Sequence, residues 1–210
     1  MFEWTEYAKF FVGLLSIVNP IGSIPIFINL TENQSNAERY RTGVQAALSV
    51  VMVLGAVLMS GEAILRFFGI TIPSFRVGGG ILILLMSISM MNARLSQIKQ
   101  TEEEAEAAAG KDSVAVVPLG IPLLAGPGAI STVIVYAHYD SSLIHYLILG
   151  SGILTVAGVV WISFRLAPHI ASALGKTGIN IITRIMGLIM SAIGIEFIAS
   201  GLKQLFPGLA

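Results

Sequence analysis

The chain has 210 residues, of which 55% are hydrophobic and only 11% are charged, and its mean hydropathy is +0.84. Soluble domains carry about 25% charged residues, so a soluble globule of this composition would lack a polar surface. Twelve Lys and Arg balance twelve Asp and Glu, which leaves no basic excess for a nucleic-acid partner. The absence of cysteine excludes disulfides, Cys-ligated metal and thiol catalysis. These properties predict a polytopic membrane protein.

Six long apolar segments follow one another along the chain. Each is between 17 and 25 residues long, and only the last contains a charged residue, Glu196. About 20 apolar residues span a bilayer as a helix, whereas a barrel strand needs only about 10 in strict alternation. We therefore predict an all-α integral membrane protein with six transmembrane helices, over Phe10–Leu30, Gly43–Gly61, Val77–Ala93, Ser113–Ala137, Ser141–Phe164 and Ile185–Leu202.

The distribution of basic residues indicates how these helices are oriented. The first, third and fifth loops hold eight Lys and Arg, against four on the side of the termini. The positive-inside rule places those loops in the cytoplasm and both termini outside. The polar segment 96–112 is predicted to be a cytoplasmic connector between two halves, 1–95 and 113–210. A regulatory or partner-binding helix is the alternative for this segment.

The two halves resemble each other at an offset of about 108 residues. Four residues recur at spacings of 107 or 108, and the pairs are Arg76 with Arg184, Gly79 with Gly187, Pro20 with Pro127 and Ser23 with Ser131. Because each half has three helices, the halves enter the membrane from opposite sides. Two inverted three-helix repeats are therefore predicted, a plan shared by many secondary transporters. A duplication that kept its fold without a symmetric mechanism is the alternative.

The first and fourth predicted helices are broken near the middle of the membrane. Pro20 and Pro25 flank Gly22 in the first, and Gly126–Gly128 has the sequence Gly-Pro-Gly in the fourth. Proline removes a backbone donor and glycine lowers helix propensity, and in hydrocarbon the freed polar groups need partners. We expect half-helices to restart at Ile21 and at Gly128, with the positive ends of their dipoles directed at the breaks.

Short polar side chains flank both breaks, and no charged residue lies beside them. Unpaired N–H groups and freed carbonyls could together bind the carboxylate and the ammonium group of a small zwitterion. The alternative is that these prolines and glycines only kink packed helices and bind no ligand. The candidate substrate-binding residues are Asn19, Pro20, Gly22, Ser23, Gly126, Pro127, Gly128, Ser131 and Thr132.

Three charged residues are candidates for gating or charge coupling. Arg76 and Arg184 begin the third and sixth helices, where each could face a central cavity or extend to the membrane interface. Glu196 is the one acid inside an apolar segment and is a candidate proton-coupling group. A position near the outer interface, close to Lys203, is the alternative for Glu196.

Enzyme chemistry is not expected. The segments predicted to be buried hold serines but no clearly buried histidine, no paired carboxylates and no Gly-x-Ser-x-Gly motif, and no Walker motif is present for ATP. His138, Asp140 and His145 resemble a metal set only superficially, because we expect them on an exposed short loop. We therefore predict no catalytic residue, no metal and no cofactor.

Segments around both breaks resemble the signature segments of the MarC family. The segments that carry the resemblance are Asn19–Phe27 with Leu30-Thr31, Pro118-Leu119 with Ala125–Ser131, Gly178–Gly187 and Gly194–Ile198. The resemblance covers the whole chain and is closest to the SnatA type of bacterial inner-membrane protein. One departure is Gly120, where Ala would be expected.

The resemblance implies a secondary transporter of small neutral amino acids such as glycine, alanine or threonine. It would act as an exporter or exchanger by alternating access across the bacterial inner membrane, with both termini periplasmic. The alternative is an accessory or drug-efflux membrane component, linked to antibiotic resistance, that transports no amino acid. The expected partners are the amino acid and the lipid bilayer. Proton coupling and a homo-oligomer are further options, and the sequence leaves the direction of transport open.

Overall fold

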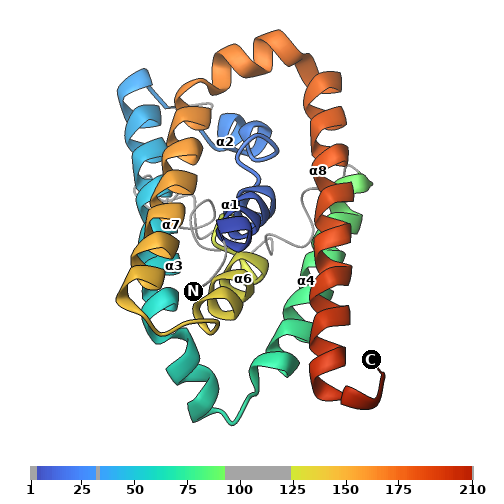
Figure 1. The fold of residues 1–210 in the computed structure, drawn as a ribbon. Helices are drawn as coiled ribbons and strands as arrows, with labels where there is room; N and C mark the ends of the chain where they lie inside the picture. Colours follow the sequence, from blue (N-terminus) through green and yellow to red (C-terminus); the bar gives the residue numbers. More distant parts are fainter. Residues whose placement is uncertain (1–3, 32–33, 93–123, 210) are drawn as a thin grey trace.

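The computed structural model describes residues 4–31, 34–92 and 124–209, and these residues are helical, without a strand (Figure 1). In chain order the elements are α1 (Trp4–Val18), α2 (Ile24–Leu30), α3 (Asn36–Phe67), α4 (Ile72–Met91), α6 (Pro127–Ala137), α7 (Leu143–Arg165), α8 (Ala167–Leu205) and the 3-10 turn η2 (Pro207–Leu209). The predicted all-α class is confirmed. The connector 96–112 and the first part of the predicted fourth helix, 113–123, lie outside the described residues.

Four of the described helices are long and apolar enough to cross a membrane. They are α3, α4, α7 and the part of α8 over Thr177–Leu205. Large apolar side chains on their outer faces are exposed, for example Met59, Leu147 and Leu188 at 63–75%. Such a surface suits contact with lipid, because hydrocarbon solvates apolar side chains and the helical backbone satisfies its own polar groups. α1, α2 and α6 are shorter, because residues 19–23 between α1 and α2 are not helical and α6 begins only at Pro127.

The described helices pack in two main pairs. α4 lies along α8, α3 lies along α7, and α1 and α6 lie between these two pairs (Figure 1). Gly80 and Gly194 face each other across the α4–α8 contact. A Cβ on Gly80 would lie 2.7 Å from the Gly194 carbonyl oxygen, and a Cβ on Gly194 would lie 2.9 Å from the Gly80 carbonyl oxygen. Glycines at both positions therefore let the two backbones approach closely.

α8 changes direction at Gly175, which has a φ of +59° and a ψ of −179°. This backbone conformation favours glycine, because a Cβ is strained there. The first part of α8 crosses one end of the bundle, and the second part runs back along α4 (Figure 1). α1 and α6 are thereby enclosed, and Phe10, Leu14 and Ile17 of α1 are at most 2% exposed.

Candidate functional site

The first helix break covers residues 19–23, between the end of α1 and the start of α2. Asn19 has a φ of +48°, in the left-handed region that asparagine adopts more readily than most residues. Its Oδ1 accepts a hydrogen bond from Gly22 N at 3.2 Å, and Ser23 Oγ donates to Asn19 O at 3.0 Å. The predicted interruption is confirmed, but a restart at Ile21 is wrong. The Asn19 and Ser23 side chains satisfy the polar groups of the turn, so the helix resumes only at Ile24.

The carboxamide of Asn19 is buried, and one side of it lacks a strong partner. Asn19 is 3% exposed, and its Nδ2 faces Met90 Sδ of α4 at 4.0 Å. A thioether sulfur is a weak acceptor, so this amide keeps donor capacity for a ligand. Gly22 permits the arrangement, because a Cβ there would lie 2.1 Å from Asn19 Nδ2.

The second predicted break lies at the start of α6, and the residues 113–123 before it are outside the described part of the chain. This helix begins at Pro127, where proline suits the first turn because its missing N–H would have no helical partner. Gly126 precedes it as the N-cap and makes no side-chain capping hydrogen bond. Thr132 Oγ1 donates to Gly128 O at 2.9 Å, which repeats the bond of Ser23 to the carbonyl four residues earlier. Each break is therefore followed by a hydroxyl bonded to a nearby backbone carbonyl.

The two breaks lie side by side although more than 100 residues separate them. A Cβ on Gly128 would lie 3.2 Å from Ile17 Cγ2 of α1 and 3.0 Å from Ile83 Cγ1 of α4. Ile17 is two residues before Asn19, so the end of α1 touches the start of α6. α4 packs against both breaks, since Ile83 lies beside Gly128 and Met90 beside Asn19.

Eight of the nine predicted substrate-binding residues are buried around these breaks. Ser131 is buried against α4, where a Cβ on Gly79 would lie 2.5 Å from its Oγ. Pro127 differs, because it is exposed. The buried members are Asn19, Pro20, Gly22, Ser23, Gly126, Gly128, Ser131 and Thr132.

A cavity of about 550 Å³ lies between α1, α6 and α8, and Thr132 joins it to the second break. Apolar side chains form most of its wall. Its charged lining residues are Lys9 and Glu196, and Tyr136 also lines it. Lys9 Nζ binds Glu6 Oε1 at 2.6 Å. Glu196 therefore faces a cavity that leads to within one helical turn of Gly128.

Arg76 and Arg184, equivalent in the sequence repeat, have different environments in the structure. Arg76 is 4% exposed and donates to Ser200 Oγ of α8 at 2.7 Å and to the hydroxyl of Tyr139, which follows α6. Its Nε is buried without a partner among the described residues. Arg184 is exposed. An inward position is therefore found for Arg76 only, where it connects α4, α8 and the end of α6.

His145 is a functional candidate that sequence reasoning missed. It is fully buried in the first turn of α7, not on an exposed loop. Its Nε2 donates to the Tyr136 carbonyl oxygen at 2.9 Å, because that oxygen can only accept, and its Nδ1 lies 3.0 Å from Tyr7 Oη. Ser142 caps α7 by accepting a hydrogen bond from His145 N. The Ser-x-x-His spacing could have placed His145 in the first turn of a helix from the sequence.

The three residues His138, Asp140 and His145 have different surroundings in the structure. Asp140 accepts a hydrogen bond from Ser142 N at 2.9 Å, and this bond lowers the pKa of the Asp140 carboxyl. His138 is exposed and its Nδ1 lies 3.3 Å from Glu62 Oε1, whereas His145 is buried. Among the described residues, no three His, Cys, Asp or Glu side chains are grouped to hold a metal ion.

Comparisons with known proteins identify the family. The model of the MarC family integral membrane protein matches residues 4–206. The UPF0056 membrane protein YhcE of Escherichia coli (strain K12) is 46% identical over 208 residues, which cover 99% of this chain and 97% of the relative. YvbG of Bacillus subtilis (strain 168), also named a UPF0056 membrane protein, is 38% identical over 200 residues, 95% of each chain. No solved structure gives a significant match. With its apolar helices, the chain therefore belongs to the MarC family of integral, multi-pass membrane proteins.

Proposed function

We propose that this protein is a secondary transporter of small neutral amino acids, such as glycine, alanine or threonine, across the bacterial inner membrane. The observation that carries the proposal is the helix break at residues 19–23, which lies beside the start of α6 at Pro127 in the bundle. Broken backbone inside a membrane protein persists where protein, water or ligand satisfies it. Paired broken helices from two halves form the substrate sites of many secondary transporters.

The chemistry of the breaks fits a small zwitterion. Asn19 Nδ2 and the N-terminal end of α6 offer donors to the carboxylate of such a ligand. The predicted binding residues include no formal charge, which favours a substrate whose own charges cancel. Ile17 and Ile83 close around Gly128, and this packing favours a small substrate side chain.

Six spans in two inverted halves provide the framework for alternating access in this proposal. α1 with α2 forms the first broken span, and α6 forms the outer half of the fourth. A two-fold axis in the membrane plane would pair the third helix with the sixth and the second with the fifth. The observed contacts of α4 with α8 and of α3 with α7 support this arrangement.

The cavity beside Thr132 gives the substrate a route from the outer end of the bundle. Arg76 bonds α8 and Tyr139 at this end, and we assign it to the outer gate. Glu196 lines the route one helical turn from Ser200, the partner of Arg76, and we assign it to proton coupling.

Competition in a counterflow assay tests the proposed substrate class. Purified protein in liposomes loaded with unlabelled alanine should accumulate labelled alanine, and external glycine or threonine should compete. External glutamate, arginine and hydrophobic drugs should not compete. Competition by drugs without competition by amino acids would favour the drug-efflux alternative and overturn the proposal.

A further inference from the structure

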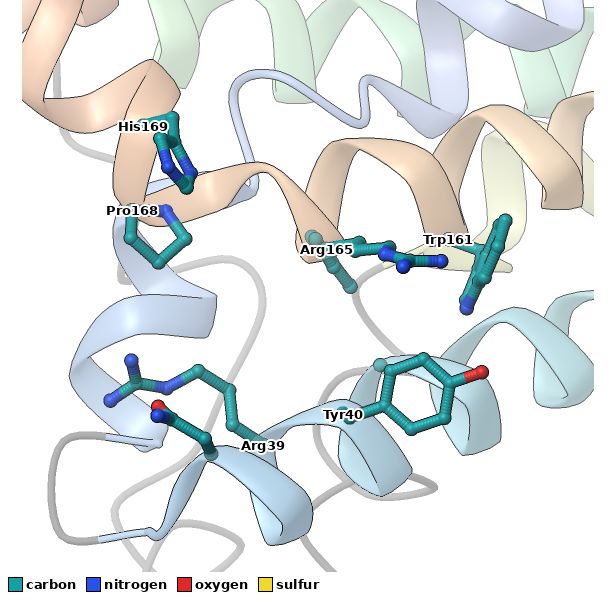
Figure 2. Close-up of a pocket in the computed structure, with 9 residues that line it drawn as sticks. Arg39, Tyr40, Trp161, Arg165, Pro168 and His169 are labelled. Atoms are coloured by element: carbon teal, nitrogen blue, oxygen red, sulfur yellow. The ribbon is translucent and has the colours of Figure 1, made fainter.

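A second pocket, separate from the helix breaks, lies where α3 begins and α7 passes into α8. Its volume is about 270 Å³, and Figure 2 shows Arg39 and Tyr40 of α3 opposite Trp161 and Arg165 of α7. His169 of α8 adds a third basic group. No acidic residue is among its lining residues in the described part of the chain.

Both arginines line this pocket, and neither is paired with a carboxylate among the described residues. Arg39 donates to the Thr31 carbonyl oxygen at 3.1 Å, and its buried Nε has no partner among the described residues. The Arg165 guanidinium lies over the Trp161 ring, 5.4 Å from its centre. Glu38, beside Arg39 in the chain, accepts a hydrogen bond from Ser35 N at 2.8 Å in the cap of α3. Guanidinium groups that line a cavity with no carboxylate among its described lining residues favour an anionic ligand, and phosphate suits guanidinium donors well.

An apolar groove continues from this pocket along the same two helices. Its volume is about 370 Å³, and Tyr40 and Trp161 line both the pocket and the groove. The groove follows α3 and α7 toward their middles, and the remaining lining residues are Val44, Ala47, Leu48, Val51, Leu154, Ala157 and Gly158. These helices are candidate membrane spans, so the pocket lies at the level of their ends and the groove at the depth of hydrocarbon.

We propose that this composite site binds one anionic phospholipid. Arg39 and Arg165 hold the headgroup phosphate, Tyr40 and Trp161 lie at the interface where aromatic rings are enriched, and an acyl chain occupies the α3–α7 groove. Basic pockets between membrane helices on the cytoplasmic side bind anionic headgroups. The loops that carry both arginines are predicted to be cytoplasmic by their excess of basic residues. Because a free phosphate would leave the groove without a ligand, the geometry points to a lipid.

Native mass spectrometry of the detergent-purified protein tests the site. The probes are phosphatidylglycerol, phosphatidylcholine with the same acyl chains, and sn-glycerol 3-phosphate. The wild-type protein should bind phosphatidylglycerol most tightly and glycerol phosphate least. Replacing Arg39→Gln or Arg165→Gln should weaken phosphatidylglycerol binding by about fivefold each. Arg41→Gln is the matched control, because Arg41 is exposed on the same helix and is not among the residues that line the pocket.

A second variant tests the groove without disturbing the arginines. Gly158 lines the groove, and nothing lies within 4 Å of the position of its Cβ, so Gly158→Leu fills the groove without a clash. It should weaken binding of both lipids severalfold, whereas Gly55→Leu, at an equally open position of α3, should not. Equal affinity for the two lipids, equal effects of Arg39→Gln and Arg41→Gln, or unchanged binding in Gly158→Leu would each overturn the proposal.

Discussion

Asn19 folds its carboxamide over Gly22 so closely that a Cβ on Gly22 would lie 2.1 Å from Asn19 Nδ2. The same carboxamide accepts a hydrogen bond from Gly22 N and keeps the break between α1 and α2 in one conformation. The orientation of the Asn19 donor therefore depends on the absence of a side chain three residues later. This relationship connects a local backbone feature with the proposed substrate site.

Replacing Gly22→Ala should disable transport while the fold is kept. The new methyl group displaces the Asn19 amide, and we expect counterflow to fall at least about tenfold, the loss of roughly one hydrogen bond to a charged group. Gly55→Ala is the control, because nothing lies within 4 Å of its Cβ position. Equal counterflow in the two folded variants would show that the Asn19 amide does not bind the substrate.

Replacing Gly80→Ala should destabilise the contact of α4 with α8. Its Cβ would lie 2.7 Å from the Gly194 carbonyl oxygen, which is backbone and cannot move aside easily. Overpacking of this kind costs about 1–3 kcal/mol, so the Tm in detergent, followed by tryptophan fluorescence, should fall by several degrees. Gly78→Ala, two residues earlier in open space, should leave the Tm unchanged or raise it. A Tm unaffected by Gly80→Ala would contradict the close packing.

Replacing Arg76→Gln should open the outer end of the bundle, because α4 then loses its bonds to Ser200 and Tyr139. The chain has no cysteine, so a single Gly13→Cys reporter in the cavity reacts against no background. Modification by a membrane-impermeant maleimide, measured on intact cells, should become severalfold faster with Arg76→Gln. Exposed Arg184→Gln should leave the rate as it is. Equal modification rates in Arg76→Gln and Arg184→Gln would show that Arg76 does not close the outer end of the bundle.

Replacing Glu196→Gln should separate exchange from proton coupling. A glutamine in the cavity keeps the side-chain shape and cannot release a proton, so counterflow should persist while stimulation by a pH gradient disappears. Glu62→Gln is the control, since Glu62 pairs with Arg66 and His138 away from this cavity. Stimulation that survives in Glu196→Gln would exclude this residue as the coupling group.

The sequence predicted the elements whose causes are local. Proline and glycine interrupt helices through their own backbone chemistry, so the break after Val18 could be located from the sequence, and the start of α6 at Pro127 was predicted to within one residue, at Gly128. The restart at Ile24 could not, because it depends on how the Asn19 and Ser23 side chains bond the turn. The bend at Gly175 also gave no signal, since a lone glycine is tolerated within a helix.

Burial of single charged or polar residues depends on tertiary packing, and the sequence repeat does not determine it. Arg76 and Arg184 are equivalent by sequence, yet only Arg76 is buried, because Ser200 and Tyr139 are placed to accept from it. His145 is buried for a similar reason, since Tyr7 and the Tyr136 carbonyl lie on two other helices. The sequence could predict that the breaks bind a substrate. The contact between them, through Ile17 and Gly128, is known only from the fold.

Counterflow of labelled alanine into liposomes tests the transporter assignment most directly. The wild-type protein and Asn19→Ala are reconstituted at equal density, after circular dichroism and gel filtration show both to be folded. We expect saturable uptake of label by the wild-type liposomes and uptake at the level of empty liposomes for Asn19→Ala. Absence of flux of alanine, glycine and threonine through folded wild-type protein would contradict the assignment.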